Sequence, residues 1–181
     1  ITPMDAWSPH RNLWVVAMNY TEGTRVVFGR PDAPEVPLAD AVMASCAIPG
    51  WFEPVEIHGT PYIDGGAWSA TSVDVLVGSG VDEVYVVAPM LSFADDEPVG
   101  FLTRVERQWR HRVTRRCMNE VNEVEAEGAQ VHVLGPGLED LQAMGANIMD
   151  TSRRVGVMET SLRTSRRAWE GGTPGSFAAT G

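Results

Sequence analysis

Short apolar runs rich in β-branched residues alternate along this chain with longer segments of helical periodicity. The apolar runs are residues 13–18, 25–28, 84–89 and 131–134. Runs of this length and composition are typical of buried strands, whereas apolar residues repeated every three or four positions are typical of helices. Strands that alternate with helices predict an α/β fold whose sheet is mainly parallel, with helices on both faces.

The predicted helices fall between and after these strands. One begins at Leu38 and is ended by Pro49 and Gly50, residue types that stop a helix. The longest spans residues 101–124, and a last amphipathic helix is predicted around residues 155–169. The apolar stripe predicted for the longest helix consists of Phe101, Val105, Trp109, Val113, Cys117, Val121 and Val124.

The composition of the 181 residues is that of an ordinary globular protein, with 44% hydrophobic and 21% charged residues. A net charge of −10 argues against a nucleic-acid partner, because such proteins carry a basic surface. No apolar run approaches the roughly 20 residues that cross a bilayer. We therefore expect a cytoplasmic protein that contacts a membrane only transiently, at its periphery. Residues 1–170 are expected to belong to one domain, and residues 171–181, rich in Gly, Ala and Thr, to form a flexible tail.

Cysteine and histidine give no sign of a metal centre. Cys46 and Cys117 lie in apolar contexts and are expected to be small core residues. The four histidines are scattered without the spacing of metal ligands. We therefore expect neither a metal nor an organic cofactor.

An acid followed by two glycines, Asp64, Gly65 and Gly66, comes directly after a predicted hairpin at residues 52–63. Strand ends are where ligands bind in open α/β sheets. Glycines beside an acid permit backbone conformations and close approaches that other residues do not allow. Taken alone, the same three residues are also typical of a tight turn.

Two sequence blocks around this acid are more specific. Residues 44–55 resemble the A-S-x-A-x-P-x-x-F-x-P-V block of the patatin-like phospholipase family, and residues 62–66 resemble its Y-x-D-G-G block. Segments within residues 69–89 and 144–150 are similar to the bacterial branch of that family. The resemblance covers most of residues 13–170 and implies the C-terminal part of one patatin-like α/β domain.

The resemblance implies a lipid acyl hydrolase that works through a Ser-Asp dyad without a histidine. In the family, a G-x-S-x-G turn presents the serine, and the D-G-G aspartate contacts it. Carried over, this makes Asp64 the base, with Gly65 and Gly66 shaping its loop. A serine hydroxyl needs an adjacent base to take its proton, and a carboxylate at hydrogen-bond distance can act as that base. The implied substrate is a lipid or another acyl ester.

The G-x-S-x-G block does not occur in this chain, and the family's glycine-rich oxyanion segment is absent as well. Both precede the present region in the family, so we expect the nucleophilic serine on an N-terminal half outside this chain. The 181 residues alone are then expected to be inactive and to need that half as a partner. Exposure is expected on the strand that holds Trp14, Val15 and Val16, because a sheet cut beside that strand has an unpaired edge.

Two other interpretations remain open. The first is a catalytically inactive lipid-binding or regulatory module of the same fold. The second is a conventional Ser-His-Asp hydrolase, in which His58 or His132 would accompany Asp64. For His58, a solvent-facing position in the hairpin turn is the alternative.

Large side chains and arginines near these segments suggest contacts with lipid. Trp51, Phe52 and Trp68 are candidates to line an acyl-chain cleft, and packing in the core is the alternative reading. The arginines of the longest helix predict one of two roles. They would either contact anionic lipid headgroups or form a solvent-exposed helix face on which they pair with acidic side chains. These arginines are Arg104, Arg107, Arg110, Arg112, Arg115 and Arg116.

Overall fold

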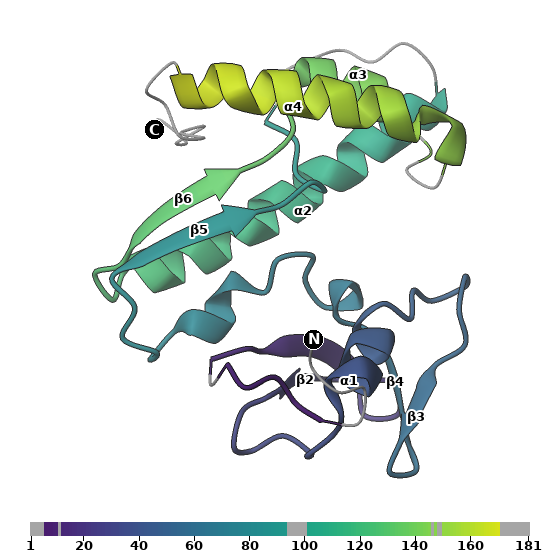
Figure 1. Ribbon diagram of the computed structural model, residues 1–181, viewed down its shortest axis with the longest axis vertical. Coiled ribbons are helices and arrows are strands. Elements are labelled where there is room, and N and C mark those ends of the chain that lie inside the picture. The colour runs from purple at the N-terminus through teal and green to yellow at the C-terminus, as the bar shows by residue number, and fades with distance from the viewer. Residues whose placement is uncertain (1–5, 11, 94–100, 146, 148–149, 171–181) are drawn as a thin grey trace. The chain divides into compact units, whose positions relative to one another are not determined.

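The computed structural model describes residues 6–10, 12–93, 101–145, 147 and 150–170. The chain forms two compact units, Ile1–Val75 and Leu76–Gly181, each with its own sheet (Figure 1). The predicted assignment of residues 1–170 to one domain stays a prediction, and the predicted tail at residues 171–181 lies outside the described residues.

The first unit contains a four-stranded antiparallel sheet in the order β2-β1-β4-β3. Tight turns join β1 to β2 and β3 to β4, so each of these pairs is a hairpin. The predicted hairpin before Asp64 is therefore confirmed. The elements of this unit are β1 (Val15–Asn19), β2 (Thr24–Phe28), α1 (Leu38–Ser45), β3 (Val55–Ile57) and β4 (Thr60–Asp64).

The core of this unit lies between α1 and the sheet. Ala41 and Ala44 of α1 are fully buried, and their small side chains let the helix pack closely on the strands. Phe28 and Tyr62 meet edge to face, with ring centroids 5.2 Å apart. The opposite side of α1 carries exposed Val42. The face that points away from the strands therefore keeps apolar character.

The second unit contains the parallel pair β5 (Glu83–Val87) and β6 (Gln130–Leu134), joined through α2 (Phe101–Glu125). Val84 and Val86 of β5 are buried, whereas Tyr85 and Val87 are exposed, the alternation expected of a strand covered on one face. Two further helices complete the unit, α3 (Leu138–Met144) and α4 (Arg154–Glu170).

A mainly parallel sheet is not confirmed. The chain combines helices and strands as expected, but the first sheet is antiparallel and only β5 and β6 pair in parallel among the described strands. Parallel pairing needs a crossover connection of a dozen or more residues, usually a helix. The segment between β5 and β6 provides such a crossover through α2, whereas the turns of the two hairpins are far too short.

The apolar stripe predicted for α2 is wrong at Val105 and Trp109, and the side chain of Phe101 lies outside the described ones. Each four-residue step rotates about 40° around a helix, so three steps back from Cys117 place Val105 about 120° away from the buried face. Val105 and Trp109 are accordingly exposed, and Arg107 and Arg110 are buried in their place. The arginine cluster therefore does not form one solvated face.

Two further expectations need correction. Cys117 is buried as expected, but Cys46 is exposed, because it follows the last turn of α1 on the side away from the sheet. The strand that begins at Val15 is not an edge, because β1 pairs with β2 on one side and with β4 on the other. The edges of this sheet are β2 and β3.

Candidate active site

Asp64 is the last residue of β4, where the strand meets the segment that follows α1. It lies opposite Ala17 of β1 in the sheet register. Its backbone N–H donates to the carbonyl oxygen of Ala47 at 3.0 Å. Pairing with Ala17 in the sheet and the hydrogen bond to Ala47 thus fix the backbone of Asp64 at the strand end.

The carboxylate of Asp64 is held by the turn that follows it. Its Oδ1 accepts a hydrogen bond from the N–H of Gly66 at 2.7 Å. In this way it caps the short 3-10 turn Gly65–Ala67. Asp64 is half-buried, and this is its only side-chain hydrogen bond within the described part of the chain. One carboxylate oxygen therefore fixes the orientation, while Oδ2 has no hydrogen bond within the described part of the chain.

A Cβ at either glycine after Asp64 would come too close to another atom. A Cβ at buried Gly65 would lie 2.5 Å from the carbonyl oxygen of Val16, which is a backbone atom of β1. A Cβ at Gly66 would lie 2.9 Å from Oδ1 of Asp64 itself. Gly65 thus permits the loop to cross β1, and Gly66 leaves room for the carboxylate.

The three aromatic residues proposed for an acyl cleft are all exposed, so core packing is the wrong reading for them. The N–H groups of Trp51 and Phe52 both donate to the carbonyl oxygen of Ile48, which fixes the turn after α1. Trp68 follows the glycine turn, and the guanidinium of Arg25 lies over its ring at 5.9 Å. Their role in lining an acyl cleft stays a prediction.

An arginine–carboxylate pair that sequence reasoning missed anchors the segment after this loop. Arg25 of β2 donates two hydrogen bonds to Asp74, of 2.7 and 2.5 Å. Arg30 donates to the carbonyl oxygen of Val75 and lies over the ring of Trp14 at 4.4 Å. These contacts tie the end of the unit back to the region of β2. Nothing local in the sequence indicates them, because the partners are far apart along the chain.

The histidine proposed to complete a triad within this unit is not near Asp64. His58 is exposed in the β3–β4 turn and contacts the carbonyl oxygen of Glu35 at 3.1 Å. The whole of β4 separates it from Asp64, about 14 Å at the usual rise per residue. His58 is thus the solvent-facing turn residue of the alternative reading.

The other histidine of interest belongs to the second unit. Nε2 of His132 lies 3.2 Å from Glu83, and its ring stacks on Tyr85 at 4.7 Å. The Tyr85 hydroxyl also donates to Glu83 at 2.7 Å, and this hydrogen bond raises the pKa of Tyr85. His132 therefore already has partners on its own sheet. Among the described residues, no group of three or more His, Cys, Asp or Glu side chains is arranged to hold a metal ion.

The first unit thus holds an oriented acid at a strand end with a glycine turn beside it. Residues 9–77 match the family model described as patatin-like phospholipase. The match contains the antiparallel sheet, α1 and the Asp64 loop, and it supports an assignment to this family and an activity as a lipid hydrolase. No curated protein matches the chain. Separately, no helix in the described ranges is long and apolar enough to span a membrane.

Proposed function

We propose that this protein hydrolyses carboxylic esters of lipids through a Ser-Asp dyad in which Asp64 is the base. The observation that carries this proposal is the carboxylate of Asp64, which is oriented by the N–H of Gly66 at 2.7 Å and keeps Oδ2 available. The family match, which includes this residue, gives the class of reaction. The nucleophilic serine is provided by an N-terminal segment outside these 181 residues.

The chemistry follows from these groups. The serine hydroxyl attacks the acyl carbon of the ester while its proton passes to Oδ2 of Asp64. Backbone N–H groups of the N-terminal segment stabilise the oxyanion, a contribution of about 3–4 kcal/mol for one donor. When the tetrahedral intermediate collapses, the alkoxide leaves with the proton from Asp64. Water then attacks the acyl-serine and gives a proton to Asp64. The bond from the serine oxygen to the acyl carbon breaks, the serine oxygen takes the proton back from Asp64, and the carboxylic acid is released.

Exposed apolar side chains near Asp64 support a binding surface for that N-terminal segment. Met43 on α1 and both Trp51 and Phe52 in the following turn are exposed. This turn directly follows Ala47, whose carbonyl oxygen accepts a hydrogen bond from the N–H of Asp64 at 3.0 Å. Where exposed apolar side chains form one patch, they mark interaction sites.

An inactive lipid-binding or regulatory module is the second candidate. It is favoured by one observation, namely that no G-x-S-x-G sequence occurs in the chain. In that case Asp64 would serve only as the cap of the Gly65–Ala67 turn.

Coexpression with the upstream half of the gene product separates these candidates. The complex should react with a fluorophosphonate probe, and Asp64→Asn should lose most of that labelling while folding normally. Asp32→Asn is the matched control, because Asp32 is an exposed acid of the same unit, and it should label like the wild type. The chain alone should not turn over a chromogenic acyl ester. Equal labelling of the Asp64→Asn complex would refute the dyad, and an upstream sequence without G-x-S-x-G would favour the inactive module.

A further inference from the structure

Helix α4 packs on α3 with its polar side. The Thr164 hydroxyl donates to Asp140 at 2.8 Å. Arg163 and Arg167 both pair with Glu139, at 2.9 and 3.1 Å. These contacts place the hydroxyl and arginine side of the helix against its neighbour, the reverse of the usual arrangement for an amphipathic surface helix.

The apolar side of α4 is consequently exposed. Val155, Met158 and Leu162 have 62%, 57% and 63% of their surface accessible. Together with Trp169, whose side chain lies outside the described ones, these are the residues whose spacing predicts an amphipathic helix from the sequence. The apolar stripe is present but is not used in packing within the described residues.

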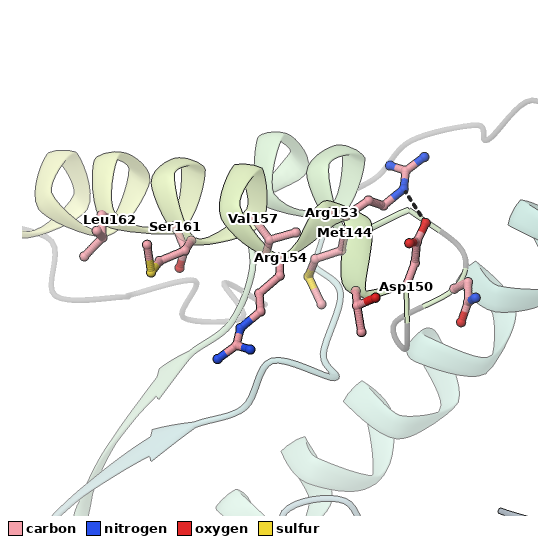
Figure 2. Close-up of a pocket in the computed structure, with 10 residues that line it drawn as sticks. Met144, Asp150, Arg153, Arg154, Val157, Ser161 and Leu162 are labelled. Atoms are coloured by element: carbon pink, nitrogen blue, oxygen red, sulfur yellow. Dashed lines mark ion pairs between the residues drawn. The ribbon is translucent and has the colours of Figure 1, made fainter.

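A groove of about 550 Å³ runs along this apolar side (Figure 2), within the size range of small-molecule sites. Its apolar lining comes from Met144 at the end of α3 and from Val157, Met158 and Leu162 of α4. Figure 2 shows Val157, Met144 and Arg154 close together, with Leu162 further along the helix.

Arg153, the last residue of the 3-10 turn Thr151–Arg153, and Arg154, the first residue of α4, differ in what they contact. Arg153 is paired with Asp150 at 3.4 Å, and Figure 2 shows it directed to that acid. Arg154 lines the groove, and no acid within the described residues pairs with it. An apolar groove with one available cation near its middle matches a ligand that has an aliphatic chain and a single negative charge.

We propose that this groove binds a single-chain amphiphilic anion, a medium- or long-chain carboxylate, with the chain along Met158 and Leu162 and the carboxylate on Arg154. The concave shape favours a molecule that lies within the groove over a flat lipid surface. The groove belongs to the second unit and Asp64 to the first, so this inference does not rest on the proposed function. Binding is therefore expected to be the same in the Asp64→Asn variant.

The test is calorimetric titration of the soluble protein, as the 181-residue chain or in complex with its upstream half, below the micelle concentration of each ligand. Decanoate and dodecanoate should bind saturably. Dodecanoate should bind about fourfold more tightly, or about twofold per methylene, because an open groove removes only part of each methylene from water. Dodecyltrimethylammonium, which has the same chain and the opposite charge, should bind at least tenfold more weakly than dodecanoate.

Matched variants locate the site. Met158→Gln with Leu162→Gln should weaken dodecanoate binding at least tenfold, whereas Val155→Gln should not change it. Val155 is as exposed as the other two and lies on the same helix, but it does not line the groove. Arg154→Gln should weaken binding about threefold to fivefold at low ionic strength, and Arg166→Gln, an exposed arginine outside the groove, should not.

Three results would overturn the proposal. These are equal affinity for the cationic and anionic ligands, equal losses in the groove and control variants, and binding to anionic vesicles without any binding of monomeric carboxylate. The last result would identify a membrane-docking face in place of a ligand groove. Circular dichroism of each variant checks that helix α4 is retained.

Discussion

Gly65 meets the backbone of Val16 so closely that a Cβ on Gly65 would lie 2.5 Å from the Val16 carbonyl oxygen. The obstructing atom belongs to β1, which is paired on both sides and cannot move aside. We predict that Gly65→Ala destabilises the protein by about 2–3 kcal/mol through overpacking, measured by urea unfolding. Gly156→Ala is the control, because Gly156 is helical with open space around it. It should stabilise the protein by up to about 1 kcal/mol.

Gly66→Ala should separate stability from activity. The atom that its Cβ would approach, at 2.9 Å, is Oδ1 of Asp64, the end of a side chain that can rotate. We predict a change in unfolding free energy below about 1 kcal/mol. The displaced carboxylate should lower fluorophosphonate labelling of the complex on the order of tenfold to hundredfold. Ala67→Gly, in the same turn, should label normally, and normal labelling of Gly66→Ala would contradict the role of Asp64 as base.

Arg110 is a fully buried cation whose loss should be costly. It pairs with Glu106 and donates to the carbonyl oxygen of Pro89 at 2.8 Å. Arg110→Met leaves a partly buried carboxylate and a carbonyl oxygen without their donor, and we predict a loss of about 3–5 kcal/mol. Arg112→Met, at an exposed position of the same helix, should change stability by less than about 0.5 kcal/mol. Similar thermal midpoints for the two variants would show that the buried pair is not required.

Asp150, at the groove, should titrate below the usual range for an aspartate. The hydroxyl of Ser152 donates to its carboxylate at 2.6 Å and the backbone N–H of Ser152 at 3.0 Å. The two hydrogen bonds, with Arg153 nearby, lower the pKa of Asp150. Since the pKa is lower in the folded state, the stabilisation is present above the ordinary pKa and is lost as the pH falls through the lowered value.

Ser152→Ala removes the largest cause of this shift. We predict that the pKa of Asp150 rises toward its ordinary value in this variant, as measured by carboxyl carbon NMR during an acid titration. Ser165→Ala, which changes a serine of α4 outside the groove, should leave the titration unchanged. An unshifted Asp150 in the wild type would contradict the hydrogen-bonded turn.

Local signals predicted the part of the fold that carries Asp64. The β3–β4 hairpin has its turn at His58 and Gly59, both with positive φ, and the sequence places turn residues there. The Pro49-Gly50 signal predicts that α1 stops but places its end too late, because the helix ends at Ser45, four residues before Pro49. The position of Asp64 at a strand end could therefore be predicted from neighbouring residues alone.

Non-local contacts explain what sequence reasoning missed. The pairing of β1 with β4 joins Ala17 to Asp64, and no local pattern specifies whether distant strands run parallel or antiparallel. Arg110 can be buried because its guanidinium donates a hydrogen bond to the carbonyl oxygen of Pro89. A pattern of apolar residues along the helix cannot predict this contact. The apolar side of α4 is exposed because the opposite side packs on α3, where the Thr164 hydroxyl donates to Asp140.

The central position of β1 has a consequence for the order in which the first unit assembles. The β1–β2 and β3–β4 hairpins each close a short loop, whereas joining β1 to β4 closes a long one between residues 17 and 64, which is entropically slower. We therefore expect the two hairpins to form first and to pair through β1 and β4 in a later step. The Asp64 turn crosses Val16 only once this pairing is complete. The carboxylate of Asp64 therefore has its position beside β1 only in the fully assembled sheet. Partly folded forms of the chain would contain Asp64 but would not hold its carboxylate in that position.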